Sequence, residues 1–528
     1  MISIGNLQIN KLCLGDVEVT KAYLGDVEVY GSTPEPVGKY LTMTVGDGAN
    51  GTTISPTIHG TLSPNLQYRV NNGSWSDFVF GTTADIHAVA GDVVQFKGIN
   101  ESGISTSERN YMKFAISGNP VALSGNVMSL IDDVGDSTVI PCDYCFYKMF
   151  STSNAKTVSQ DFLPAIELTK SCYADLFSEC LLLENAPELP ALTMKDNCYR
   201  GMFYGCQKLT QAPDLPATTL AQYCYQGLFE NCMSLVNPPK ILPAEVLRNN
   251  CYFLMFSRSA ITSAPEISAT ILAPNCCDSM FSGCKSLTTP PSLPSTSLAS
   301  YCYRSMFSNS GLTTAPALPA TSLQPYCYNS MFSGCKNLTQ APSLPATTLN
   351  NRCYRSMFQS CTRLVTPPEL NAMTLDAGCY DSMFYGCSAL QTPPALPATI
   401  IKESCYYQLF YNCSNLMTAP ELPGENLAPH CYESMFQGCS KLAQAPVLNC
   451  TTLVDNCYKG MFIGCQSLNY VKSMATEGTI KADGTAPLAL KDWLRGVAAT
   501  GTFEKPAAAV YVTDSISGIP QGWTIQNI

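Results

Sequence analysis

Residues 327–349 read CYNSMFSGCKNLTQAPSLPATTL, and a near copy, CYRSMFQSCTRLVTPPELNAMTL, begins at Cys353. A third copy, CYDSMFYGCSALQTPPALPATII, begins at Cys379. Self-similarity at a fixed period is typical of repeat architectures, in which each unit buries its apolar face only against its neighbours. The two cysteines of each unit leave three interpretations open: a disulfide framework, a metal array, or the coil of a solenoid.

The repeat extends well beyond these three copies. Its leading cysteine occurs thirteen times, at intervals of 25 to 27 residues. These residues are Cys145, Cys172, Cys198, Cys224, Cys251, Cys276, Cys302, Cys327, Cys353, Cys379, Cys405, Cys431 and Cys457. A second cysteine follows eight residues later in ten of the units. The two positions hold 23 of the 27 cysteines, so nearly all cysteines belong to the repeat.

The cysteine pattern argues against a disulfide within each unit. Three units carry serine at the second position, at Ser153, Ser259 and Ser310, yet keep their first cysteine. An obligatory pair would not lose one partner and retain the other, and free cysteine is among the most buried residue types. We therefore predict two ladders of reduced, buried thiols. Representative members are Cys198, Cys206, Cys327, Cys335, Cys379, Cys387, Cys431 and Cys439.

A metal array is a weaker interpretation of the same residues. Zinc sites gather four ligands, commonly from C-x2-C pairs. Here Cys142 and Cys145 form the only such pair, and no second pair lies near them in the sequence. The three histidines, His59, His87 and His430, share no common context. We predict that the protein uses no metal and no other cofactor.

Each unit divides into two halves. In CYxxMFxxC the Cys, Met and Cys lie at i, i+4 and i+8, which predicts a short helix with one apolar stripe. The residue before the second cysteine is usually Gly or Asn, which suits a helix end, whereas Glu179, Arg258 and Ser360 should be strained there. The proline-rich LTQAPSLP half predicts a short strand running into an extended turn. The fold class is then an α/β repeat solenoid of about thirteen coils, roughly 55–60 Å long at strand spacing.

The signature MFSGCKNLTQAPSLP resembles the BspA-like leucine-rich repeats of bacterial and phage surface proteins. Those repeats have a Phe, a small residue and a Cys, then a Leu, then a strand that closes on Pro. The resemblance covers about residues 145–471, although this unit is longer, has a Tyr after the first Cys and carries extra prolines. It implies a leucine-rich-repeat fold and a surface protein of Bacteroidales or of their crAss-like phages.

Four segments are expected along the chain. Residues 1–37 repeat NKLCLGDVEV as TKAYLGDVEV, which predicts tight β-turns and resembles the N-terminal virion-anchor segments of phage tail proteins; a plain β-meander is the alternative. Residues 38–120 alternate apolar and polar runs and predict an Ig-like β-sandwich. Residues 121–471 form the solenoid. Residues 472–528 form a C-terminal cap, in which Trp493 and Trp523 are expected to be packing anchors.

Composition limits the partners. The net charge is −10 and no basic run occurs, which argues against nucleic acid. No apolar stretch of about eighteen residues occurs, so no membrane insertion is expected. The N-terminus also lacks the features of a secretory signal, which favours synthesis in the cytoplasm without general export.

No catalytic motif is present, so we predict that the protein is not an enzyme. Carboxylates recur at one repeat position, as at Asp214, Glu266 and Glu369, which allows a glycosidase pair or, more simply, a solvated face. Every regular unit also carries Asn, Gln, Ser or Thr two residues before its inner proline. This polar row comprises Asn185, Gln211, Asn237, Ser263, Thr289, Thr314, Gln340, Thr366, Thr392, Thr418 and Gln444. It is either a surface for a glycan or protein, with Asn185, Gln211, Asn237, Gln340 and Gln444 as candidate contacts, or an internal polar ladder.

The expected function is a structural and adhesive protein of a phage virion, a tail or fibre component made in the host cytoplasm and exposed on the particle. Its N-terminal segment would bind other virion proteins, and its solenoid would bind a host glycan or protein. A trimer or another homo-oligomer is left open. The first alternative is a bacterial cell-surface adhesin, and the second is a glycan-degrading enzyme.

Overall fold

The structure, a computed structural model, describes residues 39–422, 424, 426–476, 488–513 and 517–528, together with six short strands before residue 31. These six strands pair as three antiparallel hairpins. They are β1 (Ile2–Ile4), β2 (Leu7–Ile9), β3 (Cys13–Leu14), β4 (Val17–Glu18), β5 (Ala22–Leu24) and β6 (Val27–Tyr30). The Gly-Asp turns predicted between them lie outside the described residues.

Two facing sheets lie at the N-terminal end of the solenoid. Their strands are β7 (Leu41–Val45), β8 (Thr52–His59), β9 (Gln67–Val70), β10 (Ser76–Asp77), β11 (Ile86–Ala88), β12 (Val93–Lys97), β13 (Tyr111–Gly118), β14 (Val121–Ser124) and β15 (Ala155–Val158). One sheet has the order β10-β9-β12-β7-β14-β15 and the other β11-β8-β13. Phe96 of the first sheet meets Phe114 of the second, with ring centroids 4.8 Å apart. Buried and half-buried residues alternate along β7 and β12, as expected for strands that cover a core on one face.

The sheets continue directly into the solenoid. Strand β15 belongs to the first coil, yet it pairs in parallel with β14. On the other side, the amide of Phe114 in β13 donates to the carbonyl of Met149 in the same coil at 2.8 Å. Strands β14 and β13 therefore occupy the place that a preceding coil would have, and they cover the apolar end of the stack, as a terminal repeat requires.

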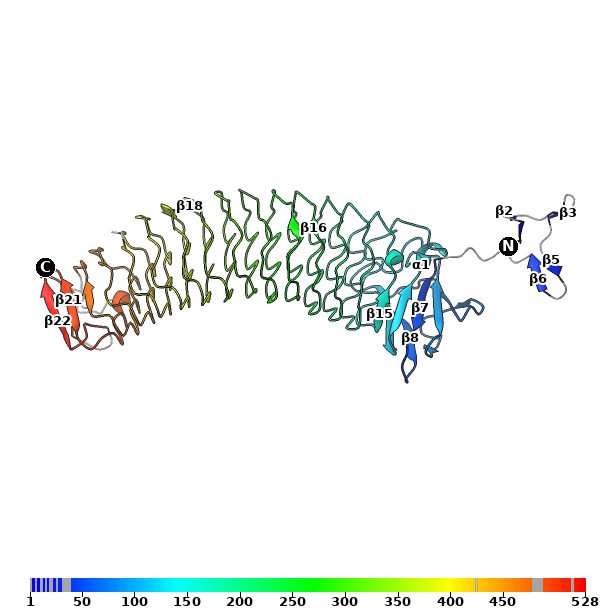
Figure 1. Cartoon of the computed structure of the whole chain (residues 1–528), viewed down its shortest axis with the longest axis horizontal. Helices are drawn as coiled ribbons and strands as arrows, with labels where there is room; N and C mark the ends of the chain where they lie inside the picture. Colours follow the sequence, from blue (N-terminus) through cyan, green and yellow to red (C-terminus); the bar gives the residue numbers. More distant parts are fainter. Residues whose placement is uncertain are drawn as a thin grey trace.

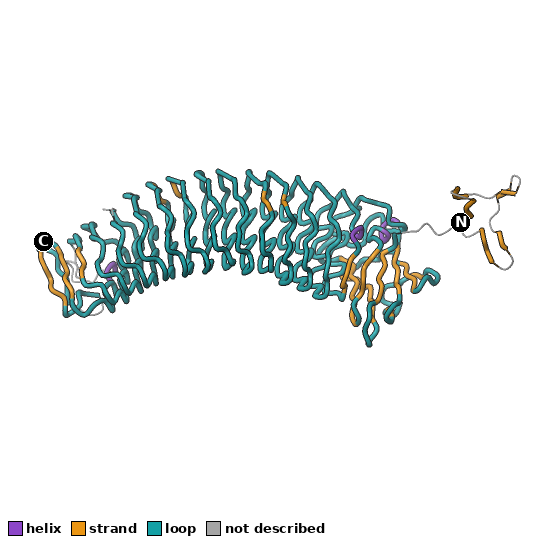
Figure 2. The backbone as a smooth tube through the Cα atoms, viewed as in Figure 1, coloured by secondary structure: helices purple, strands orange, loops and turns teal. Residues whose placement is uncertain are grey.

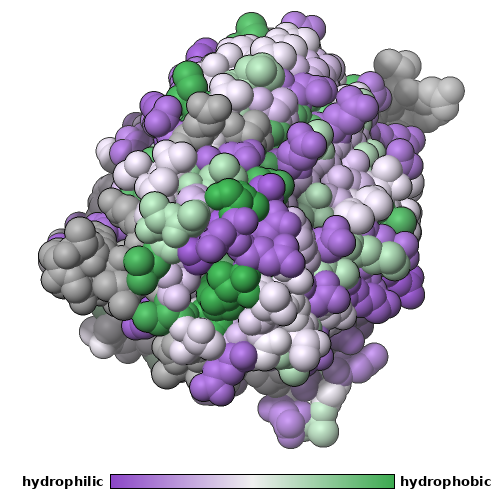
Figure 3. Space-filling view, turned by 90° about the vertical axis from the view of Figure 1, so that its left-hand side faces the viewer, coloured by the Kyte–Doolittle hydropathy of each residue, from purple (hydrophilic) through white to green (hydrophobic). Residues whose placement is uncertain are grey.

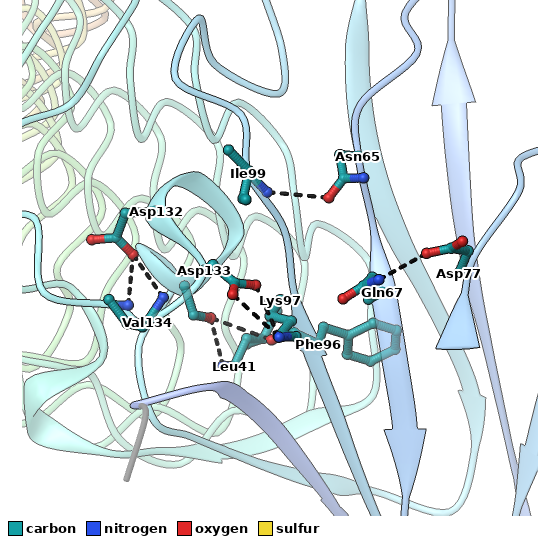
Figure 4. A network of polar contacts seen from close by, with 12 residues as sticks. Leu41, Asn65, Gln67, Asp77, Phe96, Lys97, Ile99, Asp132, Asp133 and Val134 are labelled. Carbon is teal, nitrogen blue, oxygen red and sulfur yellow. Dashed lines mark hydrogen bonds and ion pairs between the residues drawn. The ribbon is translucent and has the colours of Figure 1, made fainter. Parts of the chain in front are cut away.

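A carboxylate fixes the chain between the sheets and the first coil (Figure 4). The short helix α1 (Ser129–Asp132) ends at Asp132, whose Oδ1 accepts from the amides of Val134 and Gly135 at 3.1 and 2.6 Å. Its Oδ2 accepts from the amides of Asp136 and Ser137 at 3.0 and 2.6 Å. Four amides that would otherwise lack partners are satisfied by one side chain.

The coils stack into an arched rod (Figure 1), and almost all of their backbone is drawn as loop and turn rather than strand (Figure 2). Between Ser159 and Asn469, the described residues contain two short parallel strand pairs between coils. These are β16 (Ile241–Leu242) with β17 (Glu266–Ile267), and β18 (Thr348–Leu349) with β19 (Thr374–Leu375). Strands β16 and β18 lie towards the convex edge of the arch in Figure 1.

The helix predicted for CYxxMFxxC is wrong. In the coil of Cys198, the backbone is left-handed at every fourth residue, with φ of 56° at Asn197, 58° at Gly201 and 70° at Gly205. A left-handed residue ends an α-helix, so the chain makes successive tight turns instead. Within them the amide of Arg200 donates to the carbonyl of Asn197 at 3.1 Å, and that of Tyr204 to Gly201 at 3.0 Å. We call this half of the coil the tandem-turn face.

The remaining amides of the tandem-turn face join one coil to the next. The amide of Tyr199 donates to the carbonyl of Cys224 at 3.1 Å, and that of Gly201 to Gln226 at 2.8 Å. Every second amide is used in this way, so the turns form a continuous hydrogen-bonded stack without helices. Among the described residues, the helical segments are α1, η1 (Gln160–Phe162) and η2 (Leu488–Leu490). None of them is long or apolar enough to cross a membrane. The architecture is therefore a repeat solenoid, and its predicted α/β class is corrected.

The proline-rich half of each coil, which we call the extended face, is paired far more sparsely. The predicted strand is mostly reduced to isolated parallel bridges, such as Gln211 with Asn237 and Gln340 with Thr366. Proline supplies no amide for a ladder, so a longer strand cannot form across this sequence.

Aromatic ladders fill the interior. The phenylalanine of each MF pair stacks on its counterparts in the neighbouring coils; Phe332, for example, lies 5.8 Å from Phe307 and 5.6 Å from Phe358 between ring centroids. The tyrosine after the first cysteine forms a second ladder, in which Tyr354 and Tyr380 are 6.0 Å apart and nearly fully buried. The tyrosine ladder is therefore part of the core.

The coil geometry continues past residue 471. The amide of Phe462 donates to the carbonyl of Trp493 at 2.9 Å, in the pattern of the preceding coils. Strands β20 (Tyr470–Lys472), β21 (Gly501–Lys505) and β22 (Trp523–Asn527) form a parallel sheet on the other side. Trp493 and Trp523 are both buried. Figure 3 views the molecule from this C-terminal end, where hydrophobic and hydrophilic residues are interspersed.

Candidate functional site

The second thiol ladder has a specific bonding role. Cys335 Sγ donates to the carbonyl of Phe307 in the preceding coil at 3.0 Å, and Cys206 Sγ does the same to Phe177 at 3.1 Å. The other predicted members of this ladder, Cys387 and Cys439, bond Phe358 and Phe410 in the same way. Burial raises the pKa of the Cys335 thiol to about 11, so the group stays protonated at neutral pH and remains a donor.

The serine substitutions fit this role. Ser310 Oγ lies 3.4 Å from Cys335 Sγ, and Ser153 Oγ lies 3.4 Å from Cys180 Sγ. A hydroxyl is a small donor like a thiol, so it can occupy the same row. The cysteine at this position is thus a small polar contact between coils.

The first thiol ladder is also buried. Its predicted members Cys198, Cys327, Cys379 and Cys431 have no exposed surface. Every cysteine from Cys142 to Cys465 is a free thiol, and among the described side chains no three His, Cys, Asp or Glu gather closely enough to hold a metal ion. Both ladders therefore belong to the interior and place no reactive group on the surface of the solenoid.

The polar row lies outside the core. All its members except Asn185 are exposed, including the candidate contacts Gln211, Asn237, Gln340 and Gln444. Asn185 alone behaves as an internal ladder residue, since its Oδ1 accepts from the amide of Val158 at 3.1 Å and its Nδ2 donates to the same residue's carbonyl at 2.7 Å. The rest of the row presents neutral donors and acceptors to solvent.

The carboxylates lie beside this row on the extended face. Asp214, Glu266 and Glu369 are all exposed. A hollow of about 310 Å3 brings Gln211 and Asp214 together with Glu188 over prolines such as Pro213. A hollow of about 470 Å3 recurs in the same register further along the rod, between Thr392, Thr418 and Glu421. We call the surface bounded by the polar row and the carboxylates, with prolines as its floor, the proline groove.

The proline groove is suited to binding and not to glycoside hydrolysis. The general acid of a glycosidase needs an apolar surrounding that keeps it protonated near neutral pH. Here Glu188 and Asp214 are both exposed to solvent. Exposed amides, hydroxyls and carboxylates on a rigid backbone can instead form many weak hydrogen bonds to a long polar partner.

A third hollow was not predicted from the sequence. Its volume is about 450 Å3, and we call it the N-terminal hollow. It is lined by Thr152, Ser153, Asn154, Glu179, Leu181, Tyr204, Gly205, Gln207, Asn231 and Met233. The sequence did mark Glu179 as an exception to the Gly and Asn rule, and its φ of 59° places it in the left-handed region as expected. This exception and the apolar Leu181 and Met233 were the available signals in the sequence, but they did not show which residues gather around Glu179.

Comparisons with known proteins concern the repeats. Residues 256–391 and 379–483 match the family model described as "BspA type Leucine rich repeat region", which is less than half of the chain. The predicted resemblance is therefore confirmed for that region, whereas an origin in Bacteroidales or phages stays a prediction. No curated protein matches. A solved structure, a leucine rich cell surface protein from Faecalibacterium prausnitzii A2-165, is 14% identical and covers 74% of this chain and 93% of that chain at a TM-score of 0.27. A TM-score this low does not establish a shared fold.

Proposed function

We propose that this chain, whose residues 256–483 carry repeats of the BspA type, is a non-enzymatic adhesion protein that binds through the extended face of its solenoid. The observation that carries the proposal is the exposure of the polar row beside the proline groove. A row that repeats once per coil offers the same contacts many times, so weak individual bonds combine into a useful affinity. The partner is a glycan or a protein with a repeating polar surface.

A cell-surface location fits the repeat family better than a virion does. The repeats resemble those of surface proteins, and the comparisons contain nothing that favours a phage tail or fibre. Attachment to other virion proteins through residues 1–37 rests on the sequence resemblance alone, and we place it second. Exposure on a cell surface, with the polar row facing the environment, is the location we propose.

Binding to immobilised mucin glycans and extracellular-matrix proteins tests the function directly. Biolayer interferometry would compare the full chain with a variant that carries Gln340→Ala, Thr366→Ala and Thr392→Ala. A matched control would carry Ser308→Ala and Ser333→Ala, which lie on the tandem-turn face. We expect the polar-row variant to bind at least about tenfold more weakly, from the loss of several bonds of about 0.5–1.5 kcal/mol each, while the control is unchanged.

Two results would overturn the proposal. One is the absence of binding by the unmodified chain to any of these surfaces. The other is turnover of a surface polysaccharide that disappears with Glu188→Gln, Asp214→Asn or Glu369→Gln, because that would make the chain an enzyme.

A further inference from the structure

Comparing the same position in all thirteen coils shows where one coil departs from the others, and such a departure can mark a specialised site. The residue after the second cysteine, or after the serine that replaces it, is polar or small in eleven of the thirteen coils. Only Leu181 and Met233 are large and apolar there. Both are exposed, by 51% and 60%, so neither contributes to the core. A departure from the repeat that adds nothing to folding points to a role at the surface.

These two departures line the same cavity. Leu181 and Met233 lie two coils apart on either side of Gln207, and all three border the N-terminal hollow. Its volume of about 450 Å3 falls within the range of about 300–1,000 Å3 that is typical of small-molecule sites. The apolar pair therefore frames a space large enough for a sugar ring.

A third departure supplies a carboxylate. Glu179 occupies a left-handed position that Gly or Asn fills in most coils, and it is the only acidic residue at that position. The tandem turns place side chains in this conformation at many positions, so the feature that distinguishes Glu179 is its negative charge. In the next coil Gly205 lies directly against this side chain, since a Cβ there would be in van der Waals contact with Glu179 Cγ at 3.4 Å.

The remaining lining is polar and without positive charge. Gln207 and Asn231 carry amides that both donate and accept hydrogen bonds, as sugar hydroxyls do, and Tyr204 adds a ring with a hydroxyl. Lys113 lies close by but donates to Thr152 Oγ1 at 2.7 Å and is not among the lining residues. The charge of Lys113 also interacts with that of Glu179. An acidic sugar would therefore add a second carboxylate beside a cation that Glu179 already balances, so a neutral or amino sugar fits better.

We propose that the N-terminal hollow is a binding site for a neutral or amino sugar. Gln207, Asn231 and Glu179 would bond its hydroxyls, while Leu181 and Met233 would contact its apolar face. This deepens the proposed adhesive function, on which it rests for the expectation that the natural ligand is a surface glycan. The site is separate from the proline groove, so the two can be tested independently.

The test uses the full chain and a panel of free sugars: glucose, galactose, mannose, N-acetylglucosamine, glucosamine and glucuronic acid. Saturation-transfer NMR would detect binding, and titration calorimetry would measure it. The key variant carries Glu179→Gly, Leu181→Ser and Met233→Ser, each of which installs a residue found at the same position in other coils. Because these changes restore the repeat, we expect an unfolding temperature equal to or above that of the unmodified chain.

We expect at least one neutral or amino sugar to bind the unmodified chain with a Kd of about 1 mM and to bind the variant at least about tenfold more weakly. A matched control carries Ser360→Gly and Thr362→Ser at the same two positions of another coil and should bind like the unmodified chain. The proposal fails if no neutral or amino sugar binds, if the folded variant binds as well as the unmodified chain, or if glucuronic acid binds best.

The outcome is distinguishable from that of the adhesion test. Loss of surface binding in the polar-row variant, with sugar binding retained, would support both proposals at separate sites. Sugar binding without any surface adhesion would remove the adhesive function and leave the sugar site.

Discussion

The two faces of the solenoid differ in how they are held. On the tandem-turn face, every second amide donates a hydrogen bond to the next coil. The thiols, methionines and aromatic rings of this face are buried in the interior. On the extended face, coils meet at single bridges, and the polar row lies exposed. The tandem-turn face supplies most of the hydrogen bonds between coils. The extended face supplies few of them, so its exposed side chains can vary at little cost to stability.

This difference teaches where sequence change is costly. A repeat protein is stabilised by the interfaces between neighbouring coils. A buried residue of one coil therefore contacts both the preceding and the following coil, and its loss weakens two interfaces. Residues on the extended face outside the core contribute little to these interfaces. The predictions that follow test this contrast, from the largest expected effect to the smallest.

The largest effect is expected from the phenylalanine ladder. Phe332→Ala removes a fully buried ring that stacks on both neighbours and should lower the free energy of unfolding by about 3–5 kcal/mol. Thr339→Ala, in an exposed residue of the same coil's extended face, should change it by no more than about 0.5 kcal/mol. Chemical denaturation measures both. Equal losses would remove the distinction between the two faces.

A reciprocal pair tests the left-handed turns. Gly386 has a φ of 73°, and the nearest atom to an added Cβ would be Ser360 Oγ at 3.4 Å, an ordinary contact distance. Gly386→Ala therefore isolates the conformational cost of about 1–2 kcal/mol. Ser360 has a φ of 59° one coil earlier, so Ser360→Gly should raise the free energy of unfolding by up to about 1 kcal/mol. If Ser360→Gly instead destabilised the chain, the greater freedom of glycine in the unfolded state would outweigh the relief of strain.

The thiol ladder should respond to the loss of its donor. Cys361 Sγ donates to the carbonyl of Phe332 at 3.1 Å. Cys361→Ser keeps a donor in the row and should cost less than Cys361→Ala, by about 1 kcal/mol in the free energy of unfolding. Denaturant titration of the two variants under reducing conditions gives this difference. Identical stabilities would mean that the position requires only small size.

The smallest effect concerns pH. Burial raises the pKa of Asp278 above its ordinary value of 3.8, although Arg304 opposes the shift. The folded state thus holds this proton more tightly than the unfolded state does. The resulting stabilisation is fully present below the ordinary pKa and is lost as pH rises through the raised one. Relative to Asp278→Asn, the unmodified chain should therefore lose thermal stability as the pH rises above about 4. Parallel melting profiles would contradict this assignment.

Much of the solenoid was predictable because its period is regular. The recurrence of Cys, Met and Phe identified the interior columns, and the prolines correctly limited the strands. The tandem turns were missed because a spacing of four residues is close to the 3.6 of a helix. The signal was nevertheless present: Asn197, Gly201 and Gly205 recur every four residues, and a helix has no need of such residues in its interior.

The proposed binding surfaces were predictable only in part. The recurrence of Asn, Gln, Ser or Thr two residues before the inner proline suggested a polar row. It could not separate Asn185, which bonds the neighbouring backbone, from the exposed members. The N-terminal hollow depends on exceptions to the repeat in two coils, at Glu179 and Leu181 and then at Met233, with a regular coil between them. Their meaning emerges only when stacking brings Glu179, Gln207 and Met233 to one cavity.

The bonds between coils have a mechanical consequence. They run along the axis of the rod, and no described disulfide ties one coil to another. Tension applied to the two ends would therefore open the stack one coil at a time, each 26-residue coil releasing roughly 85–95 Å of extended chain. Force spectroscopy should record this as a series of similar steps, whereas a single cooperative rupture would contradict it. If one end of the rod is attached to a cell and the other bound to a surface, the chain would extend under flow before the bound end dissociates.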